Sequence, residues 1–276
     1  MHIRINGGEI LLNKKILFVS VFIVCLLTIS AVSAGNGLFA QDDAIHQVSL
    51  MQSFMHGEYD GVITVGELKS YGDTGLGTFE GVNGEMIVLD GVVYQAAADG
   101  SINVMEDNET VPFSTVTNFD EDEKLPEISA SSFDDLTAQL DKEIEKYGVN
   151  NIYVAKIKGD FSNITVRSVE KQEKPYKEFT EVAKVDQKVF NYTNQSGTIV
   201  AVYFPEYMSE LNMHGWHLHF LNDAKDKGGH VLGLAMENGT GGIDTIQDFD
   251  MILPHTDSFA KMDFSENMTA KINSVE

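Results

Sequence analysis

The chain has 276 residues, which is enough for one large domain or two smaller ones with apolar cores. Its formal charge is −23, and because residues 1–34 carry three basic side chains and one acidic one, the remainder carries −25. A charge of that size excludes nucleic acid and anionic lipid as expected partners. The single cysteine, Cys25, lies in the apolar run near the N-terminus, so the sequence after residue 34 has neither a disulfide nor a thiolate ligand.

Residues 1–34 show the order of features that is typical of an export signal. Basic residues precede the apolar run 16–29, and small residues follow it up to Ala34. The apolar run is shorter than the ~20 residues that a membrane-spanning helix usually needs. We expect a signal peptide cleaved near Ala34 and an exported protein that is secreted, periplasmic or at the cell surface. The alternative is an uncleaved N-terminal membrane anchor, with the mature domain outside the bilayer.

The first half of the mature sequence predicts two short helices and a set of hairpins. Apolar residues three and four positions apart predict a helix over Ala44–His56. Thr64 and Glu67 form a capping box, which predicts a second helix over Val65–Tyr71. Three turn dipeptides of the Asn-Gly and Asp-Gly type then separate four predicted strands. These strands are Gly77–Val82, Glu85–Leu89, Val92–Ala97 and Ser101–Met105.

The second half predicts one long helix followed by further strands. Ser131–Tyr147 has apolar residues at helical spacing and ends at Gly148. Alternating residues on either side of Gly159-Asp160 predict a hairpin. The strands expected from there on are Ile152–Lys158, Phe161–Val169, Ser196–Phe204, Trp216–Leu221, His230–Met236 and Ile243–Ile252.

These elements predict an α+β fold that is mostly β, with mixed or antiparallel sheets and a few helices. The strands fall into two consecutive β-rich halves, and Pro175 and its polar neighbours interrupt the pattern between them. We therefore expect an N-terminal domain over residues 35–170 and a C-terminal metal-binding domain over 171–276. The metal site is expected in the second half, near the interface of the two halves.

Three histidines indicate where that metal site lies. His217 and His219 are two positions apart in an apolar strand pattern, so their side chains share one face of the strand. A polar turn over residues 222–229 returns the chain, which places His230 on the neighbouring strand. Three imidazoles on one face form a candidate metal centre with an open position for chemistry. The other interpretation is a group of packed, hydrogen-bonded histidines.

The residues around these histidines resemble the alpha-acetolactate decarboxylase family. The resemblance covers the chain from about Leu50 to its C-terminus, and its motifs share order as well as composition. The histidine block is Gly215-Trp216-His217-Leu218-His219-Phe220-Leu221 followed by Gly228-Gly229-His230-Val231-Leu232. The other blocks are Gly66-Glu67-Leu68, residues 72–79, Gly84-Glu85-Met86, Leu89-Asp90-Gly91, Tyr94-Gln95, Pro112-Phe113, Val116-Thr117, Arg167-Ser168-Val169 and Lys174-Pro175-Tyr176.

The resemblance also implies four catalytic residues. Thr78 and Glu85 match residues of the family's active site, and Glu276 matches a glutamate near the C-terminus that returns to the metal. Arg167 is one of only two arginines in the chain, and a guanidinium holds a carboxylate in two-point geometry that a lysine cannot copy. A surface salt bridge is the alternative role for Arg167. His214 is three positions from His217, the wrong spacing for a shared strand face, and His56 and His255 are expected at the surface.

The function that the resemblance implies is decarboxylation of 2-acetolactate, a small-molecule substrate, to acetoin and CO₂. The expected cofactor is Zn²⁺, although other divalent metals such as iron or copper bind the same ligands. A zinc-dependent hydrolase and a non-catalytic metal-binding surface protein are the alternatives. A homodimer is compatible with the sequence.

Overall fold

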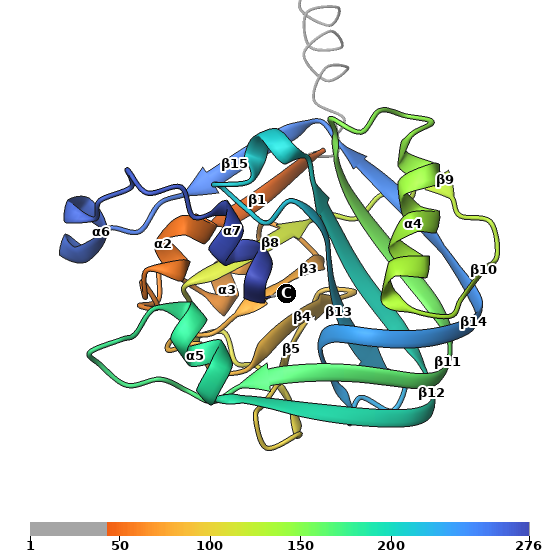
Figure 1. Cartoon of the computed structure of the whole chain (residues 1–276), viewed down its shortest axis with the longest axis horizontal. Helices are drawn as coiled ribbons and strands as arrows, with labels where there is room; N and C mark the ends of the chain where they lie inside the picture. The colour runs from red at the N-terminus through yellow and green to blue at the C-terminus, as the bar shows by residue number, and fades with distance from the viewer. Residues whose placement is uncertain (1–42, 276) are drawn as a thin grey trace, which may run out of the picture. The chain divides into compact units, whose positions relative to one another are not determined.

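Two sheets contain nearly all of the strands in this computed structural model, which describes residues 43–275 (Figure 1). One sheet has seven strands in the order β15-β1-β8-β3-β4-β5-β6. The other has the order β10-β14-β11-β12-β13, with β9 paired to β14 beside that path. The predicted mostly β, α+β fold is therefore confirmed. The predicted signal peptide lies outside the described residues.

The seven-stranded sheet takes six of its strands from the first part of the chain. Its last strand, β15, pairs in parallel with β1 and so brings a C-terminal segment back to the edge of this sheet. The strands are β1 (Ala44–Val48), β3 (Thr74–Thr78), β4 (Glu85–Leu89), β5 (Val92–Ala96), β6 (Ile102–Val104), β8 (Phe113–Thr117) and β15 (Asp248–Ile252). Two short strands, β2 (Ile63–Thr64) and β7 (Thr110–Val111), pair with each other.

The predicted helix over Ala44–His56 is wrong in its first half. Residues 44–48 form β1, which pairs with β15 on one side and β8 on the other. All five side chains of β1 are buried, so the apolar residues do not alternate as they would in a half-exposed strand. The chain turns at Ser49, where φ is 64°, and the helix α2 covers only Met51–Met55.

The six-stranded sheet contains three long strands. Its members are β9 (Glu123–Lys124), β10 (Ile128–Ala130), β11 (Ile152–Val169), β12 (Gln187–Phe204), β13 (Gly215–Asn222) and β14 (Gly228–Ile246). The predicted hairpin at Gly159-Asp160 is wrong, because β11 runs through these residues without a turn. Gly159 lies opposite Gly197 in the β11–β12 ladder, and the Asp160 carboxylate accepts a hydrogen bond from Ser196 Oγ at 2.6 Å.

The division expected after residue 170 does not separate the two sheets. β11 ends before it and β12 begins after it, yet the two strands pair from Tyr153–Tyr203 to Val169–Gln187. Residues 43–275 belong to a single compact unit. Apolar clusters join the sheets: Ile87 and Leu89 of β4 are buried with Val200 of β12 and Leu221 of β13.

The helices are short, and α4 packs against the six-stranded sheet (Figure 1). Thr64 and Glu67 form the predicted capping box of α3, and Leu136, Leu140 and Ile144 of α4 are buried in the core of the six-stranded sheet. The described helices are α2, α3 (Val65–Leu68), α4 (Phe133–Ile144), α5 (Phe179–Val185), α6 (Asp257–Lys261) and α7 (Thr269–Ile272), with 3₁₀ turns η1 (Glu206–Met208) and η2 (Asn273–Val275). Among residues 43–275, no helix is long and apolar enough to cross a bilayer.

Candidate metal centre

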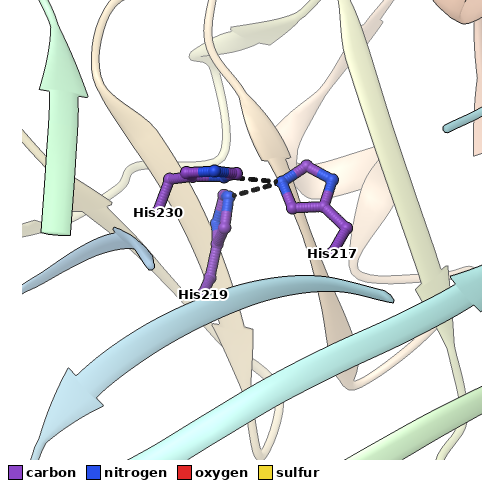
Figure 2. A group of neighbouring side chains, drawn as sticks. All are labelled: His217, His219 and His230. Atoms are coloured by element: carbon purple, nitrogen blue, oxygen red, sulfur yellow. Dashed lines mark hydrogen bonds between the residues drawn. The ribbon is translucent and has the colours of Figure 1, made fainter. Parts of the chain in front are cut away.

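The three histidines predicted from the sequence converge in the structure (Figure 2). His217 and His219 point to one face of β13, and the β13–β14 hairpin places His230 directly opposite His219. His217 Nε2 lies 3.1 Å from His219 Nε2 and 2.9 Å from His230 Nδ1. His219 and His230 are buried, and His217 is half-buried. Such a group of ring nitrogens could hold a metal ion.

The protonation of these rings suits a metal. Burial lowers the pKa of His219 to about 3, and it also lowers the pKa values of His217 and His230 well below their usual range. The positive charge of Arg167 also lowers the pKa of all three rings. The imidazoles are therefore neutral at physiological pH, which is the form that binds metals.

A contact with the other sheet sets the orientation of His219. Its Nδ1 lies 2.7 Å from the main-chain carbonyl oxygen of Met86 in β4. A carbonyl only accepts, so Nδ1 carries the proton and Nε2 presents its lone pair to the other two histidines. Three imidazole nitrogens in this arrangement fit a cation with an open coordination position.

Glu85 reaches this centre from the seven-stranded sheet. It is the first residue of β4, is 8% exposed, and its Oε2 lies 3.6 Å from His219 Nε2. Its Oε1 lies 3.9 Å from Arg167 Nε. Burial raises the pKa of Glu85 to about 7, although the positive charge of Arg167 acts in the opposite direction. Glu85, which the family resemblance implies as an active-site residue, therefore lies beside His219.

Arg167 is a buried residue of the centre and not part of a surface salt bridge. It lies on β11 opposite His230 of β14, and its side chain is 7% exposed. One terminal nitrogen, Nη1, donates a hydrogen bond to the carbonyl oxygen of Val275. Nε makes no hydrogen bond within the described residues and faces Glu85. This leaves part of the guanidinium free to bind an anion in the cavity.

Thr78 lies on the wall beside Glu85, because the two residues are opposite each other in the β3–β4 ladder. The side chain is buried, and its hydroxyl donates a hydrogen bond of 2.7 Å to the carbonyl oxygen of Gly84. That bond fixes the turn that precedes Glu85. Thr78 also lines the cavity that His217 and His230 line.

The C-terminal segment closes over the cavity. Ile272 and Val275 are buried and line it. Lys271 Nζ in this segment lies 3.7 Å from a carboxylate oxygen of Glu178 in the neighbouring chain segment and 3.1 Å from one of Glu266. Glu276 lies outside the described residues, so its predicted place at the metal is not described.

The apolar wall of the cavity is the part that sequence reasoning missed. The rings of Phe54 and Phe179 are 4.9 Å apart, and the Arg167 guanidinium lies 6.0 Å from the centre of the Phe179 ring. Met51, Val82 and Phe113 complete this wall. These residues come from four separate segments, and nothing in the sequence distinguishes them from other apolar core residues. Only the tertiary fold brings them together.

The other histidines that the structure describes do not join the centre. His214 Nδ1 lies 3.3 Å from the carbonyl oxygen of Phe204, and the residue lines a separate groove of about 690 Å³ beside α4. Trp216 and Val231 also line that groove, and as strand neighbours of His217 and His230 they point to the opposite face of the sheet. His255 is exposed, as predicted, and His56 is half-buried beside Glu178.

Comparison with known proteins identifies the family. The sequence model of alpha-acetolactate decarboxylase matches residues 45–266 of this chain. The chain belongs to the alpha-acetolactate decarboxylase family. Its resemblance to that family, seen first in short motifs, is thereby confirmed over most of the sequence.

Individual relatives agree with the family assignment. The alpha-acetolactate decarboxylase of Methanosarcina mazei is 38% identical over 234 residues, which is 85% of this chain and 80% of the relative. That of Brevibacillus brevis is 35% identical over 237 residues, 86% of this chain and 82% of the relative. The crystal structure of the Bacillus subtilis alpha-acetolactate decarboxylase superposes with a TM-score of 0.79 at 33% identity, and the match covers 84% of this chain and 98% of that one.

Proposed function

We propose that this chain decarboxylates 2-acetolactate to acetoin and CO₂ at a metal centre formed by His217, His219 and His230. One observation carries the proposal. In a member of the alpha-acetolactate decarboxylase family, three neutral imidazoles, a buried carboxyl and a buried guanidinium converge on a single cavity from two sheets. Zinc is the proposed metal, because three histidine ligands with a nearby carboxylate suit it.

The chemical demand on the site comes from the substrate. Loss of CO₂ from a β-keto acid leaves the bonding electron pair behind, and that pair moves onto the neighbouring ketone oxygen. A divalent cation at the three histidines would supply a Lewis acid that stabilises this negative charge. Aromatic side chains wall the cavity and lower its dielectric constant. The attraction between the cation and the developing negative charge is therefore stronger than it would be in water.

Arg167 is proposed to bind and orient the carboxylate that leaves as CO₂. Its guanidinium is buried, is held by Val275 and faces the cavity that His217 and His230 line. A carboxylate bound by this group is held in a fixed plane, which aligns the bond that breaks. The charge of Arg167 also offers an attractive centre for an anionic substrate in a strongly acidic protein.

Glu85 is proposed to deliver the proton that completes acetoin. The carbon that loses CO₂ must gain a proton, and a fixed donor on one face makes that step stereoselective. Glu85 is the described carboxyl closest to the histidines, and Thr78 and Gly84 hold the turn that positions it. We propose Glu276 as a second carboxyl at the same centre, because the preceding Val275 already lines the cavity.

The test of this proposal is turnover by the purified chain. Racemic 2-acetolactate is added to protein beginning at residue 35, and acetoin is measured with and without a chelator. The proposal expects acetoin formation that a chelator abolishes and added Zn²⁺ restores. Lack of acetoin from zinc-loaded, folded protein would overturn it.

We further propose that the protein is exported, on the basis of the signal-like order of features in residues 1–34. The N-terminal sequence of the native protein tests this directly. A mature chain that begins just after Ala34 supports export with cleavage, whereas an intact N-terminus on a membrane-bound protein supports the anchor.

A further inference from the structure

The turn that leads into Glu85 contains a residue with an unusual backbone conformation. Val82 has a φ of 57°, in the left-handed region that a β-branched residue very rarely adopts. Its side chain is 2% exposed, and it lines the same cavity as Glu85 and Arg167. Such a conformation costs free energy and persists only where the surrounding structure imposes it. The strain at Val82 must therefore be offset by the contacts of this turn and of the valine side chain itself.

The residue before Val82 is fixed by hydrogen bonds to two distant segments. The Gly81 N–H donates to the carbonyl oxygen of Tyr59 at 3.0 Å, and the Gly81 carbonyl oxygen accepts from the N–H of Gln172 at 2.7 Å. Gly81 itself has a φ of 76°, which suits a glycine. These contacts set the direction in which the chain enters Val82.

The residues after Val82 are fixed in the same way. The carbonyl oxygen of Asn83 accepts a hydrogen bond of 2.7 Å from Gln95 Nε2. The Gly84 N–H donates to the carbonyl oxygen of Val169 at 3.0 Å. These two partners lie on β5 and β11, one strand from each sheet. The turn is therefore held on both sides, and the Val82 side chain has a fixed position in the wall of the cavity.

The backbone of the turn does not by itself require a valine. Glycine adopts the same conformation without a steric cost, so the isopropyl group must supply contacts that offset the strain. Val82 is buried in one apolar cluster with Phe113, Phe179 and Ile272, and these three side chains line the cavity too. The valine side chain is thus part of the apolar wall that a bound ligand would meet.

The chemistry of the substrate indicates which of its groups meets this wall, and this step rests on the proposed function. The carbon of 2-acetolactate that loses CO₂ carries a carboxylate, a hydroxyl, an acetyl and a methyl group. Arg167 and the metal centre are proposed to bind oxygen atoms of the substrate, so the methyl group is left for apolar contact. Glu85 must reach that same carbon, and Val82 belongs to the turn that positions Glu85.

We propose that Val82 is a specificity-determining residue, and that its isopropyl group limits the substituent on this carbon to the size of a methyl group. The branched side chain fills the space in which a longer alkyl group would lie. Val82→Ala removes the two terminal methyl groups and so leaves room for one more carbon atom of the substrate. The variant should therefore accept an ethyl group in place of the methyl group.

The experiment compares two substrates, 2-acetolactate and the homologue that has an ethyl group in place of that methyl group. The ratio of their kcat/KM values is measured in the zinc-loaded wild type and in Val82→Ala. We expect the ratio to move toward the ethyl substrate by about 10-fold, the lower end of the usual effect of one methylene group in an apolar pocket. Val82→Gly, which also removes the backbone strain, takes the place of Val82→Ala if that variant does not fold.

The matched control is Val182→Ala. Val182 is buried in the same apolar cluster, but it is not among the described residues that line the cavity. The control should lower the melting temperature and leave the substrate ratio at the wild-type value. A wild-type ratio in the folded Val82 variant, or an equal shift in the control, would overturn the proposal.

Binding of analogues that lack the ketone separates this proposal from the proposed function. The two analogues are 2-hydroxy-2-methylbutanoate and 2-ethyl-2-hydroxybutanoate, which keep the carboxylate, the hydroxyl and the alkyl group. Their dissociation constants are measured by calorimetry with the zinc-loaded proteins. We expect the preference of the wild type for the methyl compound to fall by about 10-fold in Val82→Ala, whether or not the wild type forms acetoin. A wild type that forms no acetoin contradicts the proposed function, whereas an unchanged preference contradicts the role of Val82.

Discussion

Arg167 and His230 lie directly opposite each other on neighbouring strands, β11 and β14. Residues paired in this way point to the same face of a sheet, so the register alone brings the guanidinium beside the histidine cluster. The same pairing leaves Glu85, on the other sheet, 3.9 Å from Arg167 Nε and 3.6 Å from His219 Nε2. The positive and negative groups of the centre are thus held by two different sheets.

The first prediction concerns Arg167→Lys. The variant keeps the positive charge but loses the planar group that can hold Val275 and a substrate carboxylate together. We expect kcat/KM for acetolactate to fall by roughly 100-fold, the usual cost of removing one aligned electrostatic donor. Zinc content should stay at the wild-type level. Lys188→Arg, at a surface pair with Glu170, is the control, and wild-type rates in Arg167→Lys would place the guanidinium outside the reaction.

The second prediction concerns Glu85→Gln. Glutamine keeps the shape of the side chain but cannot transfer a proton, so we expect kcat to fall by about 100-fold or more while KM changes little. Metal content should remain at one ion per chain, since the three imidazoles are unchanged. Glu109→Gln, at an exposed position, should match the wild type. A normal kcat in Glu85→Gln would show that a group other than Glu85 transfers the proton.

The third prediction concerns the C-terminal tail. Removal of residues 275 and 276 takes away the carbonyl that holds Arg167, together with the proposed second carboxyl. We expect turnover to fall strongly while the zinc content changes little. Glu276→Gln separates the two effects, because it keeps Val275 and removes only the carboxylate charge. Normal turnover in both variants would show that the tail takes no part in the reaction.

The fourth prediction is a pH dependence of stability in metal-free buffer. Burial raises the folded pKa of Asp244, a residue of β14, to about 7 from its usual value of 3.8, so the folded state holds this proton more tightly than the unfolded state. The stability that this bound proton gives to the folded state is fully present below the unfolded pKa of 3.8, and it is lost as the pH rises through 7. Asp244→Asn resembles the protonated form at every pH.

The measurement is the melting temperature of both proteins between about pH 4 and pH 8. The wild type should become less stable relative to Asp244→Asn over this range, because only the wild type acquires the buried charge. A difference between the two melting temperatures that does not change with pH would show that Asp244 ionises normally.

Local sequence patterns predicted the histidine centre well. The spacing of His217 and His219 and the polar turn that follows are short-range features, and a hairpin needs nothing else to bring His230 back. The capping box of α3 and the apolar face of α4 were predicted correctly for the same reason.

Pairings between strands that are distant in sequence could not be predicted from such local patterns. Gly159-Asp160 has the composition of a turn, but its partners Gly197 and Ser196 keep it inside a continuous ladder. In the segment 44–48 the burial of side chains on both faces removes the two-residue alternation that would mark a strand, and one of the strands that pair with it, β15, is distant in sequence. No local sequence pattern predicts the strand register that sets Arg167 beside His230. The same is true of the aromatic wall of the cavity. Glu85 was indicated only by the resemblance to the family.

The central claim is that one metal ion at the three histidines supports the reaction. Metal-free protein is titrated with Zn²⁺ while bound zinc and the rate of acetoin formation are measured in the same samples, with His219→Ala beside the wild type and His255→Ala as the exposed control. We expect the rate to rise linearly with bound zinc to an end point of one ion per chain, with His255→Ala unchanged and His219→Ala without tight zinc or activity. Full activity in metal-free protein, or wild-type zinc binding and turnover in His219→Ala, would contradict the account.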